Sequence, residues 1–194
     1  MLDTIKTRRS TRQFKNELPT QEQIDMIVEA GRLAPSGCNV QQNHFLVIRN
    51  AEVLSKLREL VKQAFAEMTI DDTASVSIKN SVAASRRGDY IYDYNTPMLI
   101  VVANDPNNPN HIADVACAIE NMMLTANSLD LGSCWINQLR WQNENPAILS
   151  YLQSLGMADN ERVFGSVAIG YPNTADGLPN REPLTHSGNQ VTMI

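Results

Sequence analysis

The amino-acid sequence predicts an α+β fold in a single domain that spans residues 1–194. Short apolar runs typical of buried strands are separated by amphipathic stretches of unequal length, so strands and helices follow in mixed order. No glycine-rich turn joins a strand to a helix, and neither a GxGxxG nor a P-loop sequence is present. These observations favour α+β over a doubly wound parallel sheet. A length of 194 residues is enough for one domain with its own hydrophobic core.

The first half of the chain predicts helices and one strand. The predicted helices cover 2–7, 20–33 and 51–67, and an apolar run at 44–49 predicts a strand. Thr20 is a good N-cap for the second helix, and Gln23 three residues later completes a capping box. Because Pro35 disfavours helical geometry at the residue before it, this helix is expected to end near Leu33.

The second half of the chain predicts two more helices, one of them long, and three more strands. In chain order these elements are strand 97–103, helix 110–131, strand 133–138, helix 146–154 and strand 162–169. The helix over 110–131 carries a wide apolar stripe, and Gly132 is predicted to stop it. Its many small residues allow a second helix to approach closely, so a dimer interface could form there.

Two regions predict no regular element. The segment 68–95 is polar and ends in Tyr90, Tyr92 and Tyr94, which could contact a substrate or pack as a half-exposed strand. The tail from Tyr171 onward is rich in proline, glycine and asparagine and is expected to lie across a partner subunit. No apolar run is long enough to span a bilayer, and the N-terminus lacks the apolar region of a secretory signal. A cytoplasmic protein without membrane contact is expected.

The composition argues against several classes of function. A formal net charge of −5 disfavours nucleic-acid binding, since phosphate backbones repel an acidic surface. The three cysteines form no CxxC pair and the three histidines lie far apart, so neither a disulfide framework nor a metal site is expected. Cys117 and Cys134 are interpreted as buried small hydrophobic side chains, because neither has a histidine or an activating charge nearby in the sequence.

Against this acidic background, cations gather in one N-terminal segment. Lys6, Arg8, Arg9, Arg12 and Lys15 lie within ten residues of one another. Guanidinium groups match the oxygens of a phosphate, and the hydroxyl of a serine at position 10 adds to such a shell. The segment therefore predicts a site for a small anion, although a solvated basic turn is an equally good interpretation of the composition.

A second polar segment, 34–42, lies between the helix at 20–33 and the strand at 44–49. Its small, hydroxyl and amide side chains offer hydrogen-bond donors and acceptors without net charge. Such a loop can line the polar edge of an aromatic heterocycle, although an ordinary surface loop has the same composition. Near the end of the chain, Arg181 is a lone cation between two prolines.

The order and spacing of these segments resemble the nitroreductase family of FMN-dependent oxidoreductases. The segments that carry the resemblance are RRSTRQF at 8–14, APSGCNVQ at 34–41, YNTPMLIVV at 94–102, NMML at 121–124, LGSCWI at 131–136, GYP at 170–172 and REPL at 181–184. The resemblance implies a nitroreductase-like α+β fold with a central, mainly antiparallel sheet flanked by helices. It also implies a homodimer with the long central helix at the interface and an extended C-terminal arm.

The resemblance further implies a set of FMN-binding residues. Those expected to hold the phosphate, the ribityl chain and the pyrimidine edge are Arg8, Arg9, Ser10 and Arg12, with Arg181 completing the phosphate site. Those expected to line the isoalloxazine from the partner subunit are Pro35, Ser36, Gly37 and Asn39, with Gln41 as a further contact. Ile136 and Asn137 are expected near the reactive N5 edge of the flavin. No metal is implied.

The function implied is hydride transfer from NAD(P)H through FMN to a small organic acceptor such as a nitroaromatic or a quinone. In this ping-pong scheme no catalytic side chain is required, because the cofactor performs the redox chemistry. The alternative is a flavin-binding relative with a different specialised redox reaction and no efficient NAD(P)H oxidation. A non-enzymatic interaction domain is a third hypothesis. The sequence does not indicate the physiological acceptor or a preference between NADH and NADPH.

Two positions depart from the pattern of the family. Members usually carry Pro-Trp after the glutamine of the second motif, whereas this chain has Gln42 and Asn43. The loop is therefore expected to sit differently against the following strand. Glu182 stands where a second cation is common, so one contact to the FMN phosphate is expected to be missing.

Overall fold

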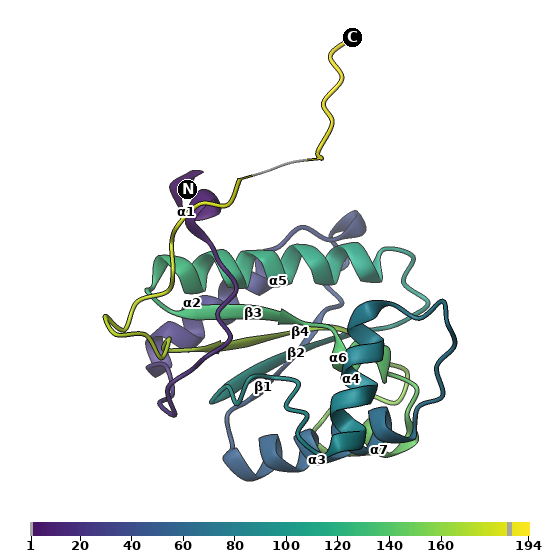
Figure 1. The fold of residues 1–194 in the computed structure, drawn as a ribbon. Helices are drawn as coiled ribbons and strands as arrows, with labels where there is room; N and C mark the ends of the chain where they lie inside the picture. The colour runs from purple at the N-terminus through teal and green to yellow at the C-terminus, as the bar shows by residue number, and fades with distance from the viewer. Residues whose placement is uncertain (1, 186–187) are drawn as a thin grey trace.

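A four-stranded antiparallel sheet forms the centre of the computed structural model, which describes residues 2–185 and 188–194 (Figure 1). The strands are β1 (His44–Ile48), β2 (Met98–Asn104), β3 (Gly132–Ile136) and β4 (Arg162–Gly170). Their order across the sheet is β1-β2-β4-β3, and every neighbouring pair is antiparallel. β3 is therefore an edge strand, and the prediction of an α+β fold with an antiparallel sheet is confirmed.

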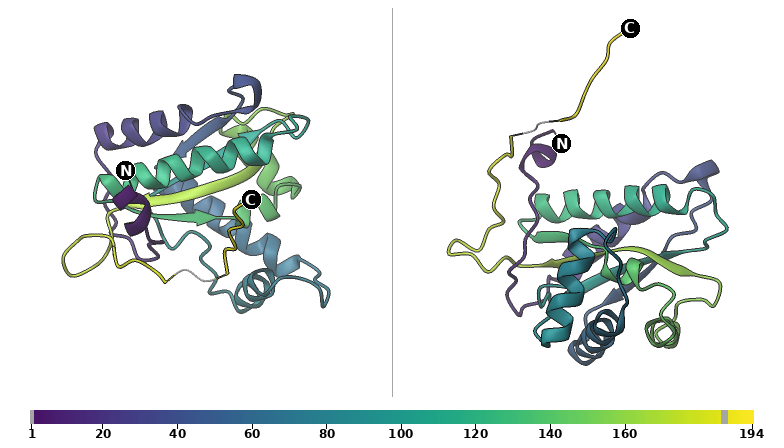
Figure 2. Two further views of the ribbon diagram at one scale, coloured as in Figure 1. Left: turned by 90° about the horizontal axis from the view of Figure 1, so that it is seen from above. Right: turned by 45° about the vertical axis from the view of Figure 1, so that its right-hand side comes forward.

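Helices cover both faces of this sheet. They are α1 (Leu2–Thr7), α2 (Gln21–Arg32), α3 (Ala51–Glu67), α4 (Val76–Arg87), α5 (His111–Ser128), α6 (Gln138–Trp141) and α7 (Pro146–Ser154), with a 3-10 turn at Gly37–Asn39. Helices α2 and α5 lie side by side on one face, and α3, α4 and α7 lie on the other (Figure 2). The capping box of Thr20 and Gln23 begins α2 as predicted.

The central strand β2 is buried along its whole length because both of its faces are covered. Leu99, Val101 and Ala103 pack toward α3, whereas Met98, Ile100 and their neighbours pack toward α2 and α5. Successive side chains of a strand point to opposite faces, so an uninterrupted apolar run is what a doubly covered strand requires. The molecule thus has two apolar cores, one on each face of the sheet.

The end of α5 differs from the prediction. The helix ends at Ser128, and the chain reverses at Asp130, whose φ of 60° lies in the left-handed region. Gly132 is already the first residue of β3 and does not stop the helix. A side chain at Gly132 would collide with Thr11, because an added Cβ would lie 2.6 Å from the Thr11 side chain. This glycine therefore permits close approach of the N-terminal segment.

Helix α4 was not predicted, because its sequence is polar and its buried face consists of small residues, Ser81, Val82 and Ser85. Local signals nevertheless bound it: the Ser75 hydroxyl accepts a hydrogen bond from the backbone N–H of Ile78, and Gly88 closes the helix in the left-handed conformation. The helix packs on α3 and covers that face of the sheet.

After β4 the described residues form neither helix nor strand, and the end of the chain extends away from the sheet in Figure 1. The beginning of this tail is fixed to the N-terminal segment by two backbone hydrogen bonds, from Lys15 to Tyr171 and from Asn173 to Gln13. Its role as an arm around a partner stays a prediction. Over the described residues, no helix combines the length and apolar character that crossing a membrane demands.

Candidate functional site

The arginine-rich segment lies along the edge strand β3 and then along the end of β4. Ser10 forms a parallel bridge with Ser133, and the backbone N–H of Thr11 donates to the carbonyl of Ser133 at 2.9 Å. Phe14 forms an antiparallel bridge with Pro172. These backbone contacts hold the segment in place without using its side chains, so the arginines are available for other partners.

The arginines of this segment differ in their partners. Arg8 lies 3.6 Å from the Glu120 carboxylate of α5. Within the described part of the chain, Arg9 and Arg12 make no ion pair with a carboxylate. The Nε of Arg9 is buried without a hydrogen-bond partner, and so is the hydroxyl of Ser133. Buried polar groups without partners are rare in folded proteins. Of the four among the described residues, the hydroxyls of Ser85 and Tyr92 lie in the core, whereas Arg9 belongs to the arginine segment and Ser133 to the strand beside it.

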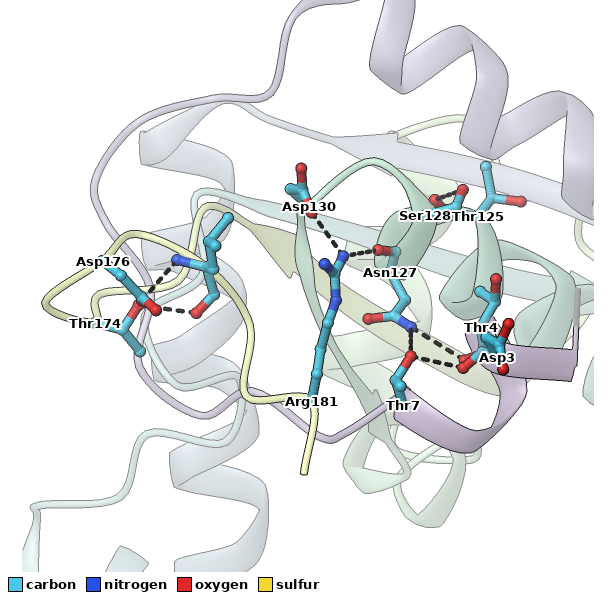
Figure 3. A network of polar contacts seen from close by, with 11 residues as sticks. Asp3, Thr4, Thr7, Thr125, Asn127, Ser128, Asp130, Thr174, Asp176 and Arg181 are labelled. Carbon is cyan, nitrogen blue, oxygen red and sulfur yellow. Dashed lines mark hydrogen bonds and ion pairs between the residues drawn. The ribbon is translucent and has the colours of Figure 1, made fainter. Parts of the chain in front are cut away.

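Arg181 reaches the same end of the molecule from the C-terminal tail (Figure 3). Its guanidinium donates to the carboxylate of Asp130 and to the carbonyl of Asn127, each at 2.6 Å. The amide of Asn127 donates in turn to the carbonyl of Thr4 and the hydroxyl of Thr7 in α1. The network ties the tail, the end of α5 and the start of the chain together, and the predicted phosphate contact of Arg181 stays a prediction.

Arg12 lies against an aromatic ring that arrives from the segment before β2. Its guanidinium carbon is 5.9 Å from the ring centroid of Tyr94. A hydrogen bond to Tyr94 is the main reason that the pKa of Arg12 lies above its usual value. Of the three tyrosines in this segment, Tyr92 is buried and Tyr90 packs on Phe65. Tyr94 therefore touches a residue of the candidate site and Tyr90 and Tyr92 pack in the core.

The cysteines divide into two kinds. Cys134 on β3 is buried, and burial raises the pKa of its thiol, an effect that the nearby Arg12 opposes. It therefore matches the interpretation as a small hydrophobic side chain. Cys117 does not, because it is exposed on the outer face of α5. The prediction of its burial was wrong because the apolar stripe of that helix turns a different set of residues toward the sheet.

The second predicted segment, 34–42, contains a strained loop at 35–41. Cys38, Asn39 and Gln41 all have positive φ, at 51°, 56° and 52°. Non-glycine residues seldom adopt this conformation, which costs of order 1–3 kcal/mol for each residue. Two hydrogen bonds hold the strained backbone. The Ser36 hydroxyl accepts from the backbone N–H of Gln41, and the Asp114 carboxylate on α5 accepts from the backbone N–H of Gly37 at 3.0 Å.

A buried polar network stands behind this loop. The other oxygen of Asp114 accepts from the amide of Asn108, and the amide of Asn43 donates to the Asp114 carbonyl. Asn104 donates to the Asn43 side chain at 2.8 Å. A side chain on Gly37 would also strike Asn110, so the loop packs tightly on the start of α5. Asn43, one of the two unusual residues after the motif, is thus an anchor of the loop.

The two predicted clusters lie toward opposite ends of α5. The loop is fixed to the first turn of the helix through Asp114, whereas Asn127, which binds Arg181, is in the last turn. With a rise of 1.5 Å per residue, these two helix positions are roughly 20 Å apart. The structure therefore places the loop and Arg181 at opposite ends of α5, with Arg8 of the arginine segment at Glu120 between them.

Ile136 and Asn137 follow the segment of β3 that Arg12 approaches. Ile136 is buried at the end of the strand. Asn137 precedes α6 without a side-chain capping bond, and its side-chain oxygen accepts a hydrogen bond from the indole of Trp135 at 2.9 Å. Their predicted place beside the flavin stays a prediction.

Sequence reasoning missed several residues that shape these clusters. They are Thr11, Asp114 and Ser133. Tyr94 was expected to contact a substrate or to pack in a half-exposed strand, and its contact with Arg12 was not predicted. An alternating run of tyrosines drew attention to Tyr94. Nothing local to Asp114 marks it, because its role depends on a loop 77 residues earlier in the chain.

The antiparallel sheet, its two helical layers and the arginine segment beside β3 agree with the nitroreductase-like α+β fold that the sequence resemblance implies. The chain belongs to the nitroreductase family, whose family model matches residues 5–171. This match includes the arginine segment, the strained loop and every strand of the sheet. It stops before Arg181 and Glu182 in the tail.

Among similar proteins, a crystal structure of a nitroreductase with bound FMN from Bacteroides fragilis is 37% identical, with a TM-score of 0.86; the match covers 99% of this chain and 97% of that one. A protein of Archaeoglobus fulgidus, provisionally named an NADH dehydrogenase/NAD(P)H nitroreductase, is 30% identical over 88% of this chain and 84% of its own length. An FMN reductase (NADPH) of Bacillus subtilis is 27% identical over 94% of this chain and 70% of its own length.

Proposed function

We propose that this chain is an FMN-dependent oxidoreductase that passes a hydride from NAD(P)H to a small organic acceptor such as a nitroaromatic or a quinone. The similar structure from Bacteroides fragilis contains FMN, and the relatives from Archaeoglobus and Bacillus carry names of NAD(P)H-dependent enzymes. The proposal places the protein in the cytoplasm, where thiols stay reduced, and its three cysteines are free.

The observation that carries this proposal is the missing acceptor at the arginine segment. The buried Nε of Arg9 and the buried hydroxyl of Ser133 have no partners, and Arg9 and Arg12 have no carboxylate among the described residues. A phosphate supplies several acceptor oxygens and two negative charges to such a group of donors. The residues therefore fit the phosphate-bearing half of FMN.

The second part of the proposal is that two copies of the chain share each site. The strained loop is fixed to the first turn of α5, Arg8 reaches Glu120 in the middle of that helix, and Arg181 contacts its last turn. The proposal is that one chain does not surround a flavin by itself. The outer face of α5 exposes Ala113 and Cys117, with Ala116 and Leu124 partly covered. A second copy packed on this face would bring its own loop toward the first copy's arginines.

The roles of the chain's own residues follow from this arrangement. Bound FMN would supply the redox chemistry, accepting a hydride at N5 and passing it on. Arg9 and Arg12 would bind the phosphate, and Arg12 would also stabilise the negative charge of reduced flavin at its pyrimidine edge. The loop around Asn39 would present backbone and amide groups to the ring. Cys134 stays a neutral thiol, because burial raises its pKa, and takes no part as a nucleophile.

The test is the visible absorption spectrum of the purified protein, incubated with FMN and then mixed anaerobically with NADH or NADPH. Flavin bands that bleach on addition of the nicotinamide support the proposal. Bands that persist with both nicotinamides contradict the NAD(P)H step and favour the flavin-binding alternative. A protein that takes up no FMN contradicts the proposal altogether. Bleached protein is then reoxidised with a nitroaromatic or a quinone to identify the class of acceptor.

A further inference from the structure

The turn that leads into β2 has an unusual backbone. Tyr94 and Asn95 are consecutive, neither is glycine, and their φ angles are 56° and 54°. Residues with side chains seldom adopt this left-handed conformation, and a bulky aromatic residue does so least readily. Strained residues of this kind persist only where the surroundings hold them, and they concentrate at functional sites.

A buried ion pair holds the turn. The Asp93 carboxylate is fully buried and accepts two hydrogen bonds from the Nε of Arg58, each at 2.9 Å. The same guanidinium donates to the carbonyl of Thr96, and Asp93 also accepts from the backbone N–H of Asn95. The pair therefore fastens the turn to α3 at both ends, and the conformation of Tyr94 between these points is fixed.

The fixed turn places the side chain of Tyr94 at the candidate site. The ring of Tyr94 is partly buried and lies against the guanidinium of Arg12, which is itself on an exposed stretch of chain. Within the described residues no carboxylate holds Arg12 in place. A long arginine side chain on an exposed segment loses much conformational freedom when it binds, and a fixed aromatic face reduces that cost.

We propose that Tyr94 is a positioning residue that holds Arg12 in the conformation in which it binds FMN. This inference rests on the proposed function and concerns how its site is organised in advance of binding. The buried pair of Arg58 and Asp93 supports the strained turn, the turn fixes the ring of Tyr94, and the ring orients Arg12. The binding affinity thus depends on a side chain that acts through the arginine.

The experiment compares Tyr94→Leu, Tyr94→Phe and wild-type apoprotein by titration with FMN and by the midpoint potential of the bound flavin. Tyr94→Leu is expected to raise the FMN Kd by about 3- to 10-fold and to lower the potential, because Arg12 is no longer held. Tyr94→Phe keeps the ring but loses the hydroxyl that hydrogen-bonds Arg12, so its FMN Kd is expected to lie between those of wild type and Tyr94→Leu. The matched control is Tyr151→Leu on α7, whose ring packs in the core against α3 and far from Arg12.

The decisive experiment combines each Tyr94 substitution with Arg12→Ala in a double variant. If Tyr94 acts through Arg12, Tyr94→Leu has no further effect on FMN binding in that background. An equal loss from Tyr94→Leu in both backgrounds overturns the inference. Wild-type protein that binds FMN while Tyr94→Leu binds equally well refutes the inference alone, whereas wild-type protein that takes up no FMN refutes the proposed function.

Discussion

The arginine segment and the strained loop differ in their charge and in their backbone conformation. The segment at 8–14 lies on the edge of the sheet through backbone bonds, and its charged side chains keep unused donors. The loop at 35–41 has no charge and strains its own backbone, and a carboxylate behind it accepts its amide hydrogen. One region supplies charge on an ordinary backbone, and the other supplies shape through an unusual one.

Because of this difference, substitutions in the two regions should affect different properties, ligand affinity in one and stability in the other. Removing charge from the segment should cost ligand affinity and leave the fold intact, since backbone hydrogen bonds hold the segment on the sheet. Removing the support of the loop should cost stability first, because buried polar groups would lose their partners. The predictions below separate these two kinds of damage.

The largest effect is expected for the double variant Arg9→Ala and Arg12→Ala. Charge-assisted hydrogen bonds contribute roughly 1.5–3 kcal/mol each, so loss of two should raise the FMN Kd by about 100-fold or more. Fluorescence titration of the apoprotein with FMN measures this change. Arg87→Ala, an exposed arginine at the end of α4, is the matched control. Affinity within a few-fold of wild type in the double variant would refute the charge assignment.

A smaller but distinct effect is expected for Asp114→Ala. The backbone N–H of Gly37 and the amide of Asn108 would both lose their acceptor, which costs about 2–4 kcal/mol in the free energy of unfolding. Urea denaturation of the apoprotein measures this loss. FMN affinity should fall as well, because the loop is released. An unchanged free energy of unfolding would contradict the stabilising role of Asp114.

Asn43→Leu tests the same support from the other side. The change removes the bond to the Asp114 carbonyl and leaves the buried amide of Asn104 without its partner, at a cost of about 1–2 kcal/mol. The free energy of unfolding should therefore fall by less than in Asp114→Ala. A variant as stable as wild type would mean that Asn43 merely fills the place of the residue usual in the family.

The smallest effect concerns the tail. Glu182 is exposed beside Arg181, at the position where the resemblance to the family leads us to expect a second cation. Glu182→Lys is expected to tighten FMN binding by no more than about fivefold, because exposed charges contribute up to about 1 kcal/mol. Titration at low and high salt measures the gain, which should shrink as salt rises. Weaker binding in this variant would place the phosphate away from the tail.

How much the sequence could predict depends on how local each signal is. Strand β2 and helix α2 follow from an apolar run and a capping box, which are properties of neighbouring residues. Helix α4 was not predicted from the sequence because its buried face is made of serines as well as valine. The partnership of Asp114 with Gly37, and of Tyr94 with Arg12, joins residues far apart in the chain, so no local pattern announces it.

The central claim, that each FMN site is built from two copies of the chain, is tested most directly by complementation. Chains with Arg9→Ala and Arg12→Ala carry one affinity tag, and chains with Gly37→Val, which drives a side chain into Asn110, carry another. Each homodimer should be nearly free of FMN. If the site is shared, the doubly purified heterodimer has one intact site and should bind one FMN per dimer. A heterodimer that binds none, or chains that never purify together, would contradict the shared site.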